Sequence, residues 1–189
     1  MKLRIALATG ALFVSGTAHA ALTGTPVTAT LVFSGSATNF FDPANLFVPA
    51  GYGNSGGQPV TIGSGTEFGF QSVSNTDTAD FTDSQLIVTD LINGGAPSPW
   101  TMTFTSAAFS SITLNTSSFS PDLTYSLLAN TITIHWAGLV TPPPGTSYSA
   151  VFDIGSGAAV PEPASWALML LGFGAIGVAV RRKGRLATA

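Results

Sequence analysis

The chain has no cysteine, which excludes disulfide bonds and thiol chemistry from its fold and function. Positive charge is almost as scarce. The six Lys and Arg residues of the 189-residue chain all lie in its first four or last nine positions: Lys2, Arg4, Arg181, Arg182, Lys183 and Arg185. Residues 21–160 therefore contain no Lys or Arg to form a salt bridge, a Schiff base or a phosphate clamp.

Acidic residues are the only permanent charges of this middle region. There are eight: Asp42, Glu67, Asp77, Asp80, Asp83, Asp90, Asp122 and Asp153. Without cations, the region cannot neutralise phosphate groups, which argues against nucleic acid and anionic lipid as partners. Its stability must come from apolar burial and hydrogen bonds.

Helical periodicity is also lacking between residues 21 and 160. Short runs alternate instead between apolar and hydroxyl side chains, which is typical of strands with one buried face. We expect strands at 27–33, 67–72, 85–92, 101–105, 109–115, 123–127, 131–136 and 148–154, with a tight hairpin at Ala129-Asn130. Of the 13 Phe residues, all but Phe13 and Phe173 lie in this region, whereas disordered stalks are poor in aromatics. The pattern predicts an all-β fold, an antiparallel β-sandwich of jelly-roll or immunoglobulin-like type.

The N-terminal residues have the three parts of a secretory signal peptide. Lys2 and Arg4 supply positive charge, Ile5–Gly16 is largely apolar, and Ala18-His19-Ala20 has the small-x-small form that signal peptidase reads. We therefore expect cleavage after Ala20, with residues 1–20 as the leader. The alternative, an uncleaved N-terminal anchor, would need a longer apolar run.

The C-terminal segment, residues 160–189, also has three parts. Pro161-Glu162-Pro163 cannot be helical and keeps the chain extended. Residues 164–180 are uncharged and would make about 25 Å of helix at about 1.5 Å per residue, a marginal transmembrane span. Trp166 suits the outer headgroup region, and the basic end Arg181-Arg182-Lys183 favours the cytoplasmic side. An ordinary membrane anchor is the alternative, but it needs neither the Pro-Glu-Pro element nor Trp166.

The order of these elements resembles the PEP-CTERM sorting signal of Gram-negative bacteria. The match runs from Pro161 to Gly174 and follows the variant with Pro-Glu-Pro, two residues and Trp-Ala, although Leu168 stands where the variant often has Met. The resemblance implies processing by an exosortase, a membrane enzyme, in bacteria that make exopolysaccharide or biofilm matrix. It also implies passage through the inner membrane, a membrane-anchored intermediate, and a final place in the cell envelope or outside the cell.

A long irregular stretch at residues 38–58 is the candidate ligand loop. Loops of this length are uncommon in compact domains and are often functional. Phe40, Phe41 and Tyr52 can form an aromatic platform for a sugar ring, with polar neighbours in the same stretch. The alternative is that the two Phe residues anchor the loop to the core of the sandwich.

Metal and catalytic candidates are few. Asp77, Asp80 and Asp83 offer the hard oxygen ligands that suit Ca2+, but their spacing lacks the pattern of a known calcium loop, and a solvated acidic edge is the alternative. His135 is the one histidine between residues 21 and 160 and falls on the polar face of its alternating run, which indicates a solvent-facing residue rather than a general base. No metal or cofactor is expected otherwise.

The sequence leaves three hypotheses for the function of the 21–159 domain. We expect a non-enzymatic surface or matrix protein associated with exopolysaccharide. A carbohydrate-binding module exported by the same route is the first alternative. A glycosidase that uses two carboxylates is the second, although no pair stands out in the sequence.

Overall fold

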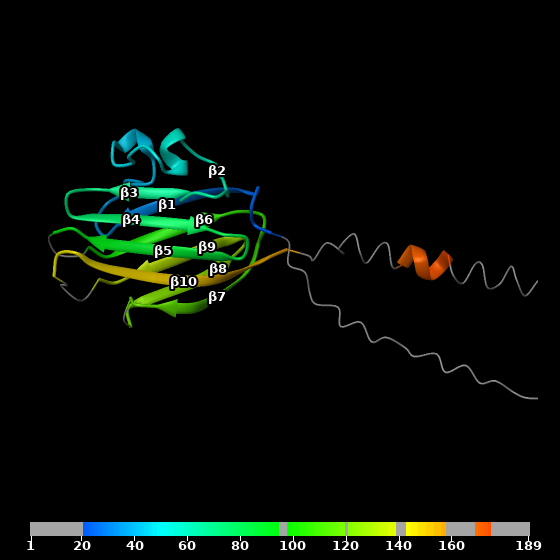
Figure 1. The fold of residues 1–189 in the computed structure, drawn as a ribbon. Coiled ribbons are helices and arrows are strands. Elements are labelled where there is room, and N and C mark those ends of the chain that lie inside the picture. The colour runs from blue at the N-terminus through cyan, green and yellow to red at the C-terminus, as the bar shows by residue number, and fades with distance from the viewer. Residues whose placement is uncertain (1–20, 95–97, 120, 139–142, 158–168, 175–189) are drawn as a thin grey trace, which may run out of the picture. The chain divides into compact units, whose positions relative to one another are not determined.

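The computed structural model describes residues 21–94, 98–119, 121–138, 143–157 and 169–174. Residues 21–157 contain ten described strands and two short 3-10 helices (Figure 1). Their bounds are β1 Pro26–Phe33, η1 Pro43–Asn45, η2 Gly53–Gly56, β2 Val60–Thr61, β3 Phe68–Gln71, β4 Asn75–Phe81, β5 Gln85–Ile92, β6 Trp100–Thr105, β7 Phe109–Ser117, β8 Leu123–Leu128, β9 Thr131–Trp136 and β10 Thr146–Ser156.

The strands form two five-stranded antiparallel sheets packed face to face (Figure 1). The first sheet has the order β2-β1-β6-β9-β8, and the second has the order β3-β4-β5-β10-β7. The two-layer antiparallel sandwich predicted from the alternating runs is therefore confirmed. Strand β9 shows the cause: Ile132, Ile134 and Trp136 are buried between the sheets, while the hydroxyl residues of the same strand face outward.

Most strands lie where the alternation predicts them, and β5 and β9 have the expected bounds. The hairpin between β8 and β9 is confirmed, because Ala129 and Asn130 both have positive φ, at 48° and 65°, as a type I′ turn requires. Strands β2 and β4 were not predicted. Strand β2 is only two residues long, and β4 places polar residues on its buried face, so the apolar alternation is broken there.

The core between the sheets is rich in aromatic rings. Phe81 stacks on Phe109 with ring centroids 5.7 Å apart and meets Phe104 edge-on at 5.4 Å. Rings of this size contribute roughly 1.5–3 kcal/mol each when fully buried. This burial replaces the disulfides and ion pairs that the sequence excludes. The many Phe residues therefore stabilise the core of a single packed domain.

Two segments predicted from the sequence lie wholly or mostly outside the described residues. The signal peptide, residues 1–20 with Ala18 and Ala20, lies outside the described residues. Of the predicted transmembrane helix at 164–180, only residues 169–174 are described, and these are helical. They belong to a unit separate from the sandwich. Among the described residues, no helix combines the length and the apolar character needed to cross a membrane.

Candidate functional site

The predicted ligand loop covers one edge of the sandwich. We call residues 34–59, between β1 and β2, the capping loop. Strand β1 pairs with β2 only at its first two residues, and side chains of the capping loop replace a strand farther along. The Ala29 N–H donates to Oε1 of Gln58 at 2.8 Å, and the Leu31 N–H donates to Oδ1 of Asn39 at 3.0 Å. These amides satisfy an edge that would otherwise be open to pairing.

Asn54 performs the same role at β3, the edge strand of the second sheet. Its side chain is fully buried. Oδ1 accepts from the Gly69 N–H at 3.1 Å, while Nδ2 donates to the carbonyl oxygens of Phe41 at 2.9 Å and of Gly69 at 3.2 Å. The side chain thus ties the capping loop to β3 through two hydrogen bonds to Gly69, and the third, to Phe41, braces the loop itself. The structural role of these amides was not predicted from the sequence.

The three aromatic residues of the predicted platform do not share one exposed surface. Phe41 is fully buried, with its ring 5.4 Å from that of Phe68, so its assignment to a ligand platform is corrected. Phe40 is half-buried against the core. The ring of Tyr52 lies on Gly69, where an added Cβ would overlap it. Packing of apolar rings against the sandwich outweighs their exposure in the loop.

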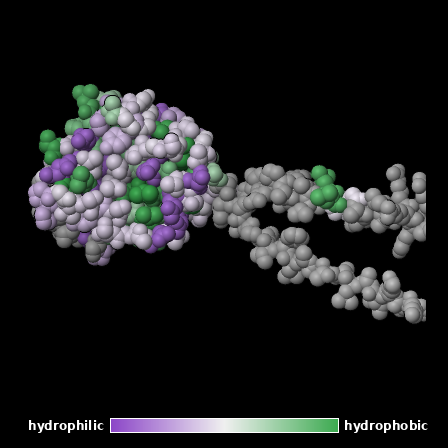
Figure 2. All heavy atoms as spheres, in the orientation of Figure 1, coloured by the Kyte–Doolittle hydropathy of each residue, from purple (hydrophilic) through white to green (hydrophobic). Residues whose placement is uncertain are grey.

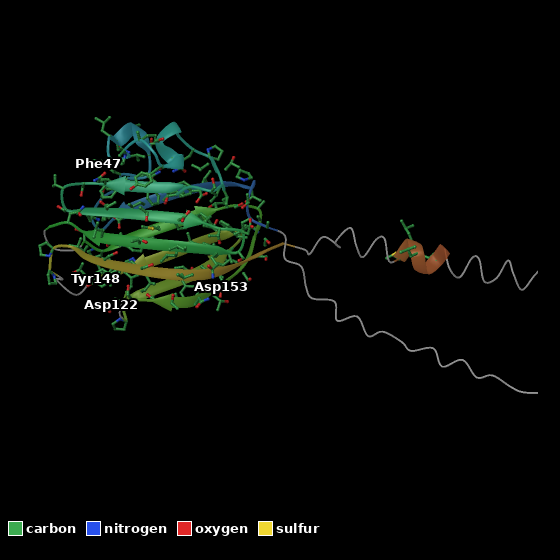
Figure 3. All side chains as sticks on the ribbon, viewed as in Figure 1. Phe47, Asp122, Tyr148 and Asp153 are labelled. Atoms are coloured by element: carbon green, nitrogen blue, oxygen red, sulfur yellow. The ribbon has the colours of Figure 1, made fainter. Side chains whose placement is uncertain are left out.

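The exposed large apolar side chains of the capping loop belong to two other residues, Leu46 and Phe47. Leu46 is 92% exposed and Phe47 is 40% exposed. Figure 2 shows hydrophobic side chains gathered over this loop, and Figure 3 labels Phe47 beside β3. The Phe47 ring lies 5.5 Å from Phe40 and 5.6 Å from Phe70, so it extends the core outward rather than standing free.

Tyr52 lines a hollow of about 300 Å3 together with the segment before β3. The carboxyl group in its wall, Glu67, is already engaged, because Oε1 accepts from the Gly63 N–H at 2.8 Å and Oε2 from the Phe81 N–H at 2.7 Å. Burial raises the pKa of Glu67, and these N–H donors oppose the rise. Glu67 therefore joins the chain before β3 to the end of β4, which is a structural role.

A pair of aspartates lies inside the sandwich. Asp77 on β4 and Asp90 on β5 are directly opposite cross-strand neighbours, and both are buried. Asp77 accepts from Nδ2 of Asn75 at 2.5 Å, and Asp90 accepts from Nε1 of Trp100 at 3.1 Å. The second oxygen of each carboxyl group has no hydrogen-bond partner among the described residues. The prediction of a solvated acidic edge is therefore wrong for Asp77.

Burial dominates the electrostatics of this pair. It raises the pKa of Asp77 well above the usual range, and the nearby Asp90 carboxylate raises it further. It raises the pKa of Asp90 to about 6, although donation from Trp100 acts in the opposite direction. Two carboxyl groups this close ionise in two coupled steps, the second harder than the first. Because both are enclosed, neither can contact a substrate from solvent.

The predicted calcium ligands point in different directions. Asp80 faces outward from β4, on the side opposite Asp77. Asp83 follows β4 and accepts a hydrogen bond from the Thr23 hydroxyl. The three carboxyl groups are not brought together, and the described part of the chain holds no group of three His, Cys, Asp or Glu side chains arranged for a metal ion.

His135 is exposed on the outer face of the first sheet. Its Nδ1 lies 3.1 Å from the Thr101 hydroxyl on the neighbouring strand. The solvent-facing position that the alternation predicts is therefore confirmed. No carboxylate of the described residues forms an ion pair or hydrogen bond with this ring, so the orienting partner of a catalytic histidine is lacking there.

The chain thus consists of an all-β domain and a C-terminal segment that belongs to a separate unit. This organisation is expected of a folded domain that carries a C-terminal sorting signal. The family model of the PEP-CTERM protein-sorting motif matches residues 159–183, and the chain carries this motif. The motif indicates a substrate of an exosortase-type sorting system, with an exosortase-type enzyme as processing partner and export to the cell envelope or beyond.

The residues assigned to this motif lie outside the described part of the chain. They are Pro161, Glu162, Pro163, Trp166, Arg181, Arg182 and Lys183. No curated protein and no solved structure gives a match to the chain. The motif therefore identifies a sorting route, while the sandwich must be understood from its own residues.

Proposed function

We propose that the protein is a non-enzymatic component of the cell surface or extracellular matrix that associates with exopolysaccharide after exosortase-type sorting. The observation that carries this proposal is the PEP-CTERM motif at residues 159–183, joined to a compact sandwich. The absence of Lys and Arg from residues 21–157 makes the domain acidic and favours neutral partners over anionic ones.

The described residues support a structural rather than a catalytic role. The closest pair of carboxyl groups by strand register, Asp77 and Asp90, is enclosed by the core. His135 contacts a threonine hydroxyl and faces solvent. A glycosidase would need two accessible carboxyl groups on either side of a sugar bond. This arrangement favours a scaffold over an enzyme.

Processing at both ends completes the proposal. Signal peptidase cleaves after Ala20, residues 164–180 hold the intermediate in the inner membrane, and an exosortase-type enzyme cleaves near Pro161-Glu162-Pro163. Both basic ends are then removed. The mature product is a cation-free, cysteine-free sandwich released to the envelope or the extracellular space.

Mass spectrometry of the protein from its native cells tests this route. We expect a mature N-terminus at Ala21 and a C-terminus near Pro163 in the extracellular or envelope fraction. The variant Glu162→Gln should accumulate in the membrane fraction with its tail intact, whereas Ser165→Ala, a control in the same segment, should be processed normally. An intact C-terminus through Ala189 in the wild-type protein at steady state would establish a plain membrane anchor instead.

A further inference from the structure

The outer face of the second sheet contains a hollow near one end of β10. Strand register places Gln85 of β5, Asp153 of β10 and Thr113 of β7 in one row across the sheet. The hollow has a volume of about 290 Å3. It is lined by Ser84, Ser111, Thr113, Asp153, Ile154 and Gly155, and we call it the Asp153 hollow.

Two irregularities in the pairing of β10 with β7 shape this hollow. The register shifts between Val151 and Phe152 and again between Gly155 and Ser156, so Asp153 lies between two irregularities of the kind that β-bulges produce. Bulges bend a strand and redirect its side chains, and they are frequent next to binding sites. At Gly155, an added Cβ would overlap Oγ of Ser111. The glycine therefore leaves room for the Ser111 hydroxyl against β10.

Two amide side chains hold the Asp153 carboxylate in place. Nε2 of Gln85 donates to Oδ1 at 2.8 Å, and Nδ2 of Asn115 donates to Oδ2 at 3.1 Å (the labelled residue is shown in Figure 3). A carboxylate has about four acceptor positions, so capacity remains for further donors. The carboxylate is thus oriented before any ligand arrives, which lowers the entropic cost of binding.

The hydroxyl groups around this carboxylate are free to bind a ligand. The side chains of Ser84, Ser111 and Thr113 are exposed, and none makes a hydrogen bond to another described residue. An oriented carboxylate acceptor, amide groups and hydroxyls that can both donate and accept match the vicinal hydroxyls of a sugar ring. No Lys or Arg lies in residues 21–157 to pair with an acidic sugar.

We propose that the Asp153 hollow binds a neutral pyranose residue of a polysaccharide, with the Asp153 carboxylate accepting hydrogen bonds from two of its hydroxyls. This inference rests on the proposed association with exopolysaccharide and gives it a site. No aromatic ring lines the hollow, so each site binds weakly, with a dissociation constant on the order of 1 mM. Many copies on one polysaccharide reach useful avidity through high effective concentration.

Titration of the 15N-labelled domain, residues 21–157, followed by two-dimensional NMR, tests the site. The domain is one compact unit, and its amide spectrum reports its fold directly. The probes are methyl glycosides of glucose, galactose and mannose, N-acetylglucosamine, and dextran as a neutral polymer. We expect saturable shifts at residues 84–85, 111–115 and 153–155 for at least one probe. Lack of saturable shifts there with every probe up to about 100 mM would overturn the proposal.

Two variants and one control separate the site from general effects. Asp153→Asn keeps the shape but removes the charged acceptor, and should weaken binding at least tenfold. Ser111→Ala removes an exposed hydroxyl with no protein partner and should weaken binding about threefold with an unchanged spectrum elsewhere. Asp122→Asn makes the same charge change at a distant position, as the labels in Figure 3 show, and should bind as the wild type does. Equal binding by wild type and Asp153→Asn would also overturn the site.

The same variants distinguish failure of the site from failure of the proposed function. Exopolysaccharide purified from the producing cells is offered to the full mature protein in a pull-down. If wild type and Asp153→Asn are retained equally, the association stands and the Asp153 site is wrong. If neither is retained, the association with exopolysaccharide itself is wrong. Loss of retention only in Asp153→Asn supports both.

Discussion

The Asn54 side chain and the Asp77–Asp90 pair are both buried in this sandwich, but they differ in how completely their polar atoms are hydrogen-bonded. At the capped edge, Asn54 is fully buried and all three of its side-chain hydrogen bonds reach backbone groups. Inside the sandwich, Asp77 and Asp90 are equally buried, but each has an oxygen atom without a described partner. Because a buried polar atom without a hydrogen-bond partner costs free energy, we expect Asn54 to stabilise the domain and the acid pair to destabilise it when ionised.

The largest expected effect is at Asn54. The variant Asn54→Ala leaves one buried N–H and two carbonyl oxygens without their partner and weakens the attachment of the capping loop to β3. We expect a loss of about 3 kcal/mol in the free energy of unfolding, measured by urea denaturation at pH 7. Ser55→Ala, in the same short helix but exposed, should change it by less than about 0.5 kcal/mol. A loss below about 1 kcal/mol for Asn54→Ala would remove its assigned role in closing the edge.

For the Asp77–Asp90 pair, we expect a smaller effect on the free energy of unfolding, and one that depends on pH. The folded pKa of Asp90 is about 6, above the unfolded value near 3.9, so between these values the folded state binds more protons than the unfolded state. Stability then falls as pH rises through this window, and the raised pKa of Asp77 extends the fall to higher pH. We expect the free energy of unfolding to drop by on the order of 2 kcal/mol between pH 4.5 and 7.5.

The variant Asp90→Asn isolates the pair. It removes one titrating group, keeps the size of the side chain and adds a donor for the free oxygen of Asp77. We expect it to flatten the pH dependence and to be more stable than the wild type at pH 7.5. Asp122→Asn, a change of the same charge outside the core, should retain the wild-type slope. A slope unchanged in Asp90→Asn would mean that the pair does not control the pH response.

The sequence was informative where alternation is uninterrupted and uninformative where polar atoms are buried. Strand β9 alternates cleanly and was predicted with its bounds. Strand β4 was missed because Asn75 and Asp77 interrupt the apolar positions with polar side chains. The edge amides were missed for a related reason: Gln58 bonds a residue 29 positions away, and no local pattern records that contact.

The candidate sites divide in the same way. The sorting motif is a continuous stretch of chain, so it was recognised from sequence and is confirmed by the family match. The aromatic platform was expected from loop residues alone, and Phe41 proved to be core because the facing Phe68 ring is supplied by another strand. The Asp153 hollow depends on the register of β5, β10 and β7, which only the fold provides.

The smallest expected effect concerns a polar contact that remains in water. On the outer face of the first sheet, the hydroxyl oxygens of Thr105 and Thr131 lie 3.0 Å apart across β6 and β9, in an exposed contact. Thr131→Val keeps the branched side chain and removes the hydroxyl, and water can then solvate Thr105. We expect a change of about 0.5 kcal/mol or less in the free energy of unfolding. A double-mutant cycle with Thr105→Val measures the coupling. A coupling free energy above about 1.5 kcal/mol would contradict the difference between buried and exposed polar contacts. The exposed hydroxyl pair would then contribute as much as one of the buried hydrogen bonds of Asn54.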